Sequence, residues 1–498
     1  MNQNKLLIRN AASGTVMQIA KLFLNFVVRT IFIHTLGNQA LGLNGLFTNI
    51  LSLLSLTELG FGAAVVTHMY KPIAEQNHTR IRVLMGVYRT IYLGVGAMVA
   101  ILGLMLVPFI PTITRTYTGS LNVEFIFFLY VANIVFSYTL GYRTSMLTAD
   151  QRGYVVNITT LLGFLMQSFM QVIVLFVFRS FYLYLVVAIL ATVFQNLYLS
   201  YRVKKDYPYL RGQKKRASID DLRSVMDYAK PLLVYQVSGV VNNSTDSIVI
   251  SQFLSVAMTG LYSNYMMIVS ALLSLMTAMV SAITSTIGNL AAARPHDLYQ
   301  AFKRIFSVIS SVSIFVGFCL GGLLNPFIVI WLGDASSLNW LVSGSFAINL
   351  FVTLIGLPLM VFREATGSFV YRRYIPIISV VINLVVSVIL VNFLGVGGVI
   401  IGTLTSRLLT YTWNDPDVIF KHHFRIRPRG FLIRIYRLIL IMAILIFGEA
   451  FLVSRIQNWT FLRFVILSVL VVGVSVFVSY MYLRNKVSIR ELIHGKII

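Results

Sequence analysis

One face of the first apolar segment, residues 11–36, carries polar side chains and two cations. At 100° per residue, five positions of this segment fall within about 80° of one another on a helix. We term these positions the first stripe: Gly14, Gln18, Lys21, Asn25 and Arg29. A cation near the bilayer centre costs about 2.5 to 3.5 kcal/mol on insertion scales, so the stripe should not face lipid. We expect it to line a cavity for an anionic cargo.

A second stripe follows the same logic in the apolar segment 224–252, after a helix start at Lys230–Pro231. Its members lie within about 100° on one helical face: Tyr235, Ser238, Asn242, Thr245 and Asp246. Two polar stripes on separate helices would line a cavity with polar side chains on two sides. The predicted cargo-binding residues are therefore Gln18, Lys21, Asn25, Arg29, Ser238 and Asn242.

Depth along the helices suggests partners for the charged groups. If residues 37–41 form a tight turn, Lys21 and Glu58 both lie about 24 to 26 Å below it, at 1.5 Å per residue, and can pair. Arg29 lies about 12 Å below that turn, and Asp246 lies at nearly the same depth below its own turn at Leu254. We hypothesise that Arg29 and Asp246 approach each other across the closed cavity.

Each of these residues also has an alternative role. Arg29 would otherwise make a structural bond between helices, and Glu58 would simply neutralise Lys21. Asp246 and Glu58 are candidate gating or ion-coupling groups, with H⁺ or Na⁺ as the coupling cation. Arg407, with polar neighbours on its helical face, is a further candidate for cargo binding.

The composition is that of a polytopic membrane protein. The 498 residues are 57% hydrophobic and 11% charged, with a mean hydropathy of +0.82. At about 20 apolar residues per crossing, the sequence predicts an all-helical chain with fourteen spans. The predicted spans are 11–36, 42–67, 83–107, 123–148, 153–178, 181–203, 224–252, 257–290, 303–331, 338–362, 368–393, 397–414, 432–453 and 461–483.

The net charge of +24 fits membrane topology better than nucleic-acid binding. Of the 40 Lys and Arg residues, 31 fall in connectors on one predicted side and four on the other. By the positive-inside rule both termini are cytoplasmic. The longest cytoplasmic connectors, about twenty residues each, are too short to fold as a catalytic domain.

The motifs give no sign of an enzyme. We find no set of nucleophile, base and orienting residue and no HExxH zinc motif, so no catalytic residue and no metal site is assigned. The single cysteine, Cys319, excludes disulfides within the chain. Asp415-Pro416-Asp417 is interpreted as a helix stop and His422-His423 as part of a basic loop.

An internal repeat appears when the chain is shifted by 218 residues. Gly42-Leu43 then overlays Gly260-Leu261, and Asn25 overlays Asn243. The repeat predicts two pseudo-symmetric six-helix lobes, residues 1–203 and 224–420, followed by two appended helices in residues 432–484. Parallel repeats of this kind are a known transporter plan, with the cargo at the lobe interface.

The two repeated hairpins resemble a known family. The runs Arg29–Gly62 (RTIFIHTLGNQALGLNGLFTNILSLLSLTELGFG) and Asp246–Asn264 (DSIVISQFLSVAMTGLYSN) resemble polysaccharide flippases of the Wzx type. These belong to the MOP superfamily, which also contains lipid II flippases and MATE drug exporters. The resemblance implies transfer of an undecaprenyl-pyrophosphate-linked oligosaccharide from the inner to the outer leaflet of the bacterial cytoplasmic membrane, for extracellular polysaccharide assembly. It also implies that Lys21 and Arg29 meet the anionic head group, which would compete with Asp246 for Arg29.

The expected partners are the anionic lipid-linked oligosaccharide, membrane lipids and the polysaccharide polymerase machinery, without nucleic acid. No cofactor is expected apart from the candidate coupling cation. Two relatives remain as alternatives. A lipid II flippase would differ only in its cargo, whereas a MATE-like cation-coupled drug exporter should have twelve spans and an acidic cavity. A membrane glycosyltransferase or polymerase would need a large outer loop with catalytic residues, and none is present in the sequence.

Overall fold

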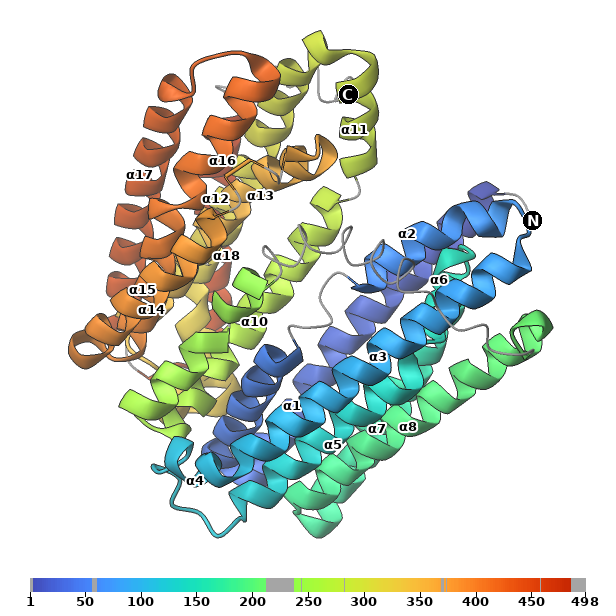
Figure 1. Ribbon diagram of the computed structural model, residues 1–498. Coiled ribbons are helices and arrows are strands. Elements are labelled where there is room, and N and C mark those ends of the chain that lie inside the picture. The colour runs from blue at the N-terminus through green and yellow to red at the C-terminus, as the bar shows by residue number, and fades with distance from the viewer. Residues whose placement is uncertain are drawn as a thin grey trace. The chain divides into compact units, whose positions relative to one another are not determined.

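The computed structural model describes residues 3–55, 61–211, 237–242, 244–281, 283–368, 371–372, 374–456 and 458–484. Every regular element in these residues is helical, as predicted. The chain forms two compact units, Met1–Gly260 and Leu261–Ile498 (Figure 1). The predicted lobe boundaries at residues 203, 224 and 420 stay a prediction. The predicted site residue Glu58 lies outside the described residues, as do Tyr235 of the second stripe and the predicted helix start at Lys230–Pro231.

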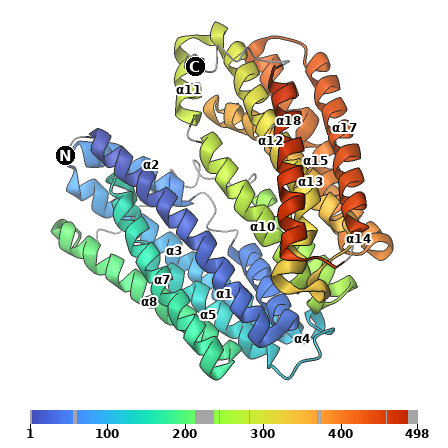
Figure 2. The same ribbon diagram turned by 180° about the vertical axis from the view of Figure 1, so that it is seen from behind.

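The first unit is built from long helices that run side by side in both views (Figures 1 and 2). The long helix α1 packs along α7, and α5 packs against both α3 and α8. Short helices α2, α4 and α6 complete the connections. The bounds are α1 Gln3–Leu54, α2 Phe61–Ala74, α3 His78–Leu106, α4 Ile110–Ile113, α5 Val123–Gly141, α6 Thr144–Ala149, α7 Gly153–Phe178 and α8 Phe181–Asp206.

Several of these helices start where a polar side chain caps the free backbone N–H groups. The Asn77 side chain accepts from the N–H of Arg80 at 3.0 Å at the start of α3. Asn122 caps α5 in the same way, and the Ser180 hydroxyl caps α8. Such caps stabilise a helix by about 1 kcal/mol because the first N–H groups have no partner within the helix.

Aromatic side chains fill the interior between α1 and its neighbours in the first unit. Phe32 of α1 meets the edge of Phe181 of α8, with ring centroids 5.2 Å apart. Phe47, in the second half of α1, meets Phe127 of α5 at 5.3 Å. Edge-to-face pairs of this kind add about 0.5 to 1.5 kcal/mol beyond the burial of their surface. The face of α1 opposite its exposed residues is therefore a packed core.

The second unit starts inside helix α10, and α12 is its longest helix. In this unit α12 packs against α13, α17 and α18, and α14 packs against α15. Figures 1 and 2 show α12, α17 and α18 side by side. The bounds are α10 Val256–Ser281, α11 Thr284–Ala293, α12 Leu298–Leu332, α13 Trp340–Ala365, α14 Ile375–Leu394, α15 Val396–Leu409, α16 Tyr411–Ile419, α17 Arg429–Ser454 and α18 Phe461–Arg484.

Eleven helices of the described residues are long and apolar enough to cross a membrane. The sequence predicts fourteen spans, and the difference falls at three places. The predicted spans 11–36 and 42–67 share one helix, Ala12–Leu54. Much of the predicted span 224–252 lies outside the described residues. The predicted span 397–414 breaks at Thr410, which leaves α15 with 14 residues.

The junction of the first two predicted spans is sharper than the expected five-residue turn. Gly37 has φ 79° and ψ 175°, and helical geometry resumes directly after it. A residue with a side chain rarely adopts this backbone conformation, so glycine is required there. A single residue, and not a loop, therefore redirects the chain.

Candidate functional site

The N-terminal half of the first stripe faces α7. A Cβ added to Gly14 would lie 3.5 Å from the side-chain nitrogen of Asn157, a residue of α7. Seven residues later, the ammonium of Lys21 lies 5.7 Å from the centre of the Phe164 ring, also on α7. This is within the range of a cation–π contact. Lys21 and Gln18 are half-buried, whereas Asn25 is exposed.

Arg29 lies next to α8. It is half-buried and interacts electrostatically with the phenol of Tyr184. The Tyr184 ring in turn packs on Phe32, with centroids 5.1 Å apart. Arg29 therefore has an aromatic neighbour in its own unit, which fits the alternative of a bond between helices. The same contact would hold the guanidinium in place for an anion, so its role in binding stays a prediction.

The second stripe lies on the helical residues 237–242 and 244–253. Its members Ser238, Asn242 and Asp246 recur every four residues and are all buried, so these polar side chains share one face of this helix. Next to Asp246, the hydroxyl of Ser247 accepts a 2.7 Å hydrogen bond from the Asn49 amide of α1. The contact places the helix of Asp246 beside the second half of α1.

The far end of this helix is fixed by the connection after α4. The Gln252 amide donates to the carbonyl of Ile113 at 2.9 Å, and the Ser251 hydroxyl donates to the same oxygen at 3.2 Å. The guanidinium of Arg115 donates to the carbonyl of Gln252 at 3.2 Å. These three bonds hold residues 251–252 against the end of α4 and the connection that follows it, all within the first unit.

Two glycines that the 218-residue repeat relates make reciprocal backbone contacts. A Cβ on Gly42 would overlap the carbonyl oxygen of Val256, and one on Gly260 would overlap the carbonyl oxygen of Asn38. Since 38 and 256 also differ by 218, the second contact is the first one with the repeats exchanged. This is the pattern of a self-complementary two-fold contact. We term it the glycine crossing.

Arg407 lies in the second unit and is tied to a neighbouring helix. Its guanidinium donates a 2.6 Å hydrogen bond to the hydroxyl of Thr353 on α13. The side chain is half-buried. Among the residues that the structure describes, no group of three His, Cys, Asp or Glu side chains is placed to hold a metal ion.

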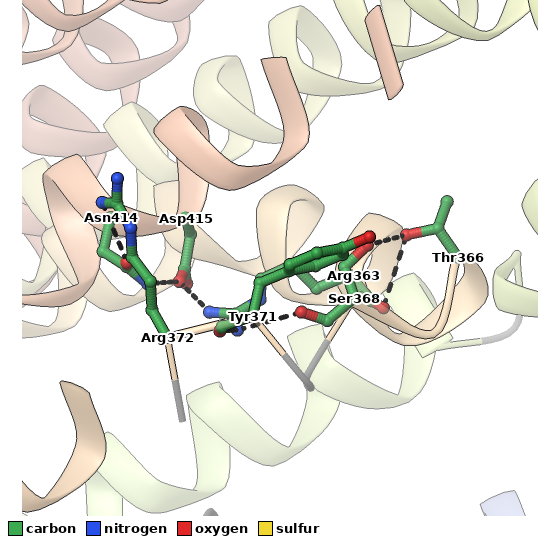
Figure 3. Close-up of polar contacts among 7 residues, drawn as sticks. All are labelled: Arg363, Thr366, Ser368, Tyr371, Arg372, Asn414 and Asp415. Carbon is green, nitrogen blue, oxygen red and sulfur yellow. Dashed lines mark hydrogen bonds and ion pairs between the residues drawn. The ribbon is translucent and has the colours of Figure 1, made fainter. Parts of the chain in front are cut away.

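The acidic motif 415–417 is not a helix stop, because α16 continues through Pro416 to Ile419. Instead, its first carboxylate is the partner of an arginine at the end of α13. Arg363, only 1% exposed, forms an ion pair with Asp415. It also donates to the carbonyls of Ser368 and Tyr371, both at 3.4 Å (Figure 3). We term the following residues the connector cluster: Arg363, Ser368, Tyr371, Arg372, Asp415, Asp417, Lys421 and His423.

The second carboxylate of the motif adds a more exposed pair to the cluster. Asp417 binds Arg372 at 2.5 Å and Lys421 at 2.9 Å. The ring of His423 shares a 2.6 Å hydrogen bond with the Ser368 hydroxyl. Burial and the neighbouring His422 lower the pKa of His423, and burial raises the pKa of Asp415 against the opposing effect of Arg363. The cluster thus ties the α13–α14 connection to α16.

One intramembrane carboxyl was missed by the sequence analysis. Glu449 lies in α17, and neither of its buried side-chain oxygens has a hydrogen-bond partner among the described residues. Its carboxyl packs on α12, where a Cβ on Gly321 would lie 3.1 Å from one oxygen and one on Gly322 would overlap the other. A lone acid within an apolar span is itself a signal of a site, so this residue was recognisable from the sequence.

The fold of this chain matches several solved structures of membrane transporters. The inward-closed lipid II flippase MurJ matches with TM-score 0.61 and 14% identity, over 95% of this chain and 99% of that one. An inward-facing multidrug resistance MATE family transporter of the MOP superfamily matches with TM-score 0.61 and 15% identity, over 82% and 98%. The Vibrio cholerae MATE transporter VcmN, in its bent form, matches with TM-score 0.54 and 15% identity, over 84% and 97%. No curated protein matches the sequence.

At these identities the solved structures establish the fold alone, that of multi-pass MOP-superfamily membrane transporters. The family match comes from the sequence itself. Residues 7–287, more than half of the chain, match the family described as polysaccharide biosynthesis protein. The resemblance of the two repeated hairpins to flippases is thereby confirmed, and the chain belongs to the polysaccharide biosynthesis protein family.

Proposed function

We propose that the protein flips an undecaprenyl-pyrophosphate-linked oligosaccharide repeat unit from the inner to the outer leaflet of the bacterial cytoplasmic membrane, by alternating access. Both termini would be cytoplasmic. The observation that carries the proposal is the glycine crossing, which joins two repeat-related hairpins in a chain of this family. Transporters built from repeats alternate by moving one repeat against the other around a fixed site.

The glycine crossing suits such a movement for a physical reason. Where two backbones touch with no side chain between them, the contact is either made or broken, since packed interfaces are bistable and not continuously deformable. Gly42 follows the bend at Gly37 that ends the helical segment of the first stripe, and Gly260 lies in α10, shortly after the helix of the second stripe. Opening the crossing would therefore change the separation of the stripes.

In this mechanism Arg29 and Lys21 bind the pyrophosphate, while Gln18, Asn25, Ser238 and Asn242 offer hydrogen bonds to the glycan. Asp246 pairs with Arg29 when the closed cavity is empty, and the pyrophosphate of the cargo competes with Asp246 for Arg29. Carrying a negative head group outward can draw on the membrane potential, about 2.3 kcal/mol per charge per 100 mV. A coupling cation, H⁺ or Na⁺, bound at Asp246 or Glu58 is the alternative source of free energy.

A leaflet-accessibility assay in proteoliposomes tests the proposal. The cargo is a fluorescent polyprenyl-diphosphate sugar, and the reaction of outer-leaflet sugar with an added modifying enzyme is followed. We expect Arg29→Ala to lower the flipping rate at least tenfold and Lys21→Ala to lower it less. Arg455→Ala, which removes an exposed cation that belongs to neither stripe, is the matched control. Wild-type rates in both stripe variants would remove the site assignment, and no flipping by the wild type would remove the function.

The second candidate function is that of a lipid II flippase. It is favoured by one observation, that the alignment with MurJ covers 95% of this chain whereas the two MATE structures above cover 82% and 84%. Adding unlabelled lipid II to the same assay distinguishes the two cargoes. Stronger competition by lipid II than by a polyprenyl-diphosphate oligosaccharide would assign the alternative. Transport of a cationic drug in place of either lipid would favour a MATE-like exporter.

A further inference from the structure

A pocket of about 480 Å³ lies in the second unit, between α12, α17 and α18. Its floor is apolar and largely aromatic. Phe302, Phe420, Phe431 and Ile435 line it and are all buried. The Phe302 and Phe431 rings lie 5.6 Å apart, so these side chains form one continuous wall.

The same pocket is lined by three exposed cations, Lys303, Arg434 and Arg437. The Lys303 ammonium lies 4.9 Å from the centre of the Tyr299 ring, and the Arg434 Nε donates to the carbonyl of Gly430 at 2.9 Å. Within the described part of the chain, none of the three forms an ion pair with a carboxylate. The rim therefore has positive charge that is available to a ligand.

Phe302 and Phe431 lie at the level of the cations, and further apolar side chains line the pocket deeper along the same helices. Lys303 lies in the first two turns of α12, and Arg434 and Arg437 lie in the first three turns of α17. By the positive-inside rule these helix ends are cytoplasmic, so the rim lies at the level of the inner-leaflet head groups. Ile441 and Phe306 line the pocket further along the same helices, toward the hydrocarbon. A ligand that fits both regions is an anionic amphiphile.

We propose that this pocket binds an anionic glycerophospholipid of the inner leaflet, with its phosphate on Lys303, Arg434 and Arg437 and its upper acyl chains on Phe306, Leu438 and Ile441. Basic pockets between helices on the cytoplasmic side are known to take lipid head groups. Exposed cations of this kind contribute about fivefold each in affinity, so the site suits an abundant ligand. The pocket contains none of the predicted cargo residues, which argues for a resident phospholipid in place of the flipped cargo.

Native mass spectrometry of the purified full chain tests the proposal. Phosphatidylglycerol and phosphatidylcholine are titrated against the wild type and against Arg434→Gln/Arg437→Gln. The matched control is Arg425→Gln/Arg427→Gln, which removes two exposed cations of the preceding connection that do not line the pocket. We expect phosphatidylglycerol to bind the pocket variant roughly 25-fold more weakly than the wild type, and the control to behave as the wild type.

A fluorescence measurement covers the case in which the double variant misfolds. Ile441 lines the pocket and is 47% exposed, so Ile441→Trp should be tolerated. Brominated phosphatidylglycerol should quench the added tryptophan more than brominated phosphatidylcholine, after subtraction of the wild-type signal. Equal quenching by the two lipids, or equal weakening in the control variant, would overturn the proposal. Preferential quenching by a brominated polyprenyl phosphate would assign the pocket to the carrier lipid and also overturn it.

Discussion

Two buried carboxylates of the second unit have opposite surroundings. Asp415 pairs with Arg363 and accepts a 3.1 Å hydrogen bond from the Asn414 amide. The oxygens of Glu449 are equally enclosed, yet they pack on the Gly321–Gly322 backbone and accept no hydrogen bond. Asp415 lies within the short helix α16, whereas Glu449 lies within α17, which is long and apolar enough to cross a membrane.

The difference indicates which buried carboxyl group stabilises the contact between two segments. A paired carboxylate fixes two segments, because breaking the pair leaves an uncompensated charge. A carboxyl group that accepts no hydrogen bond does not hold two segments together. Its ionised form is also costly in an apolar environment. We therefore expect the connector cluster to be structural and the Glu449 contact to be replaceable.

Loss of the arginine should have the largest effect. Arg363→Ala leaves Asp415 buried and unpaired, which should cost about 3 to 5 kcal/mol of stability. Thermal unfolding in detergent measures the change. Arg372→Ala removes a more exposed pair and should cost less than about 1 kcal/mol. Similar losses in the two variants would mean that burial does not set the strength of the pairs.

A methyl group on α12 should disturb the contact of Glu449. Gly322→Ala places a Cβ on a carboxyl oxygen, and overpacking of this kind costs about 1 to 3 kcal/mol. Because the clash involves the end of a side chain, adding Glu449→Ala should relieve most of the loss. The double variant is measured by the same unfolding assay. Simple addition of the two losses would contradict the contact between Gly322 and Glu449.

An isosteric amide should separate the two acids clearly. Glu449→Gln keeps the shape of the side chain and removes no hydrogen bond, so we expect a change within about 1 kcal/mol. Asp415→Asn removes a buried charge that Arg363 needs and should destabilise by more. Equal effects on the unfolding temperature would show that Glu449 has a partner after all.

The smallest expected effect is a pH dependence of the connector cluster. The pKa of His423 is lowered in the folded protein, so the unfolded chain takes up the proton first as pH falls below about 6.5. Stability from this group is present at higher pH and is lost on acidification. His423→Gln should remove that part of the pH dependence between about pH 7 and 5. An unchanged profile in this variant would assign the dependence to another group.

The sequence predicted the fold well because hydrophobicity decides membrane spans. The 218-residue repeat related Gly42 to Gly260, but that the two hairpins meet at these glycines is known only from the structure. The sequence did not predict the break at Thr410 or the partner of Asp415, because both depend on packing between segments distant in the chain. The stripes were placed on helical faces by periodicity, but which neighbour Lys21 or Arg29 meets is decided by the position of α7 and α8.

The glycine crossing can form only late in the synthesis of the first unit. Gly42 and Asn38 emerge early, but the backbone that covers them belongs to Val256 and Gly260. At about 5 to 20 residues per second, the missing half follows roughly 10 to 40 s later. During that interval the bend of α1 is inserted without its partner. The first unit can therefore close only when residues from the start of the second repeat have been translated.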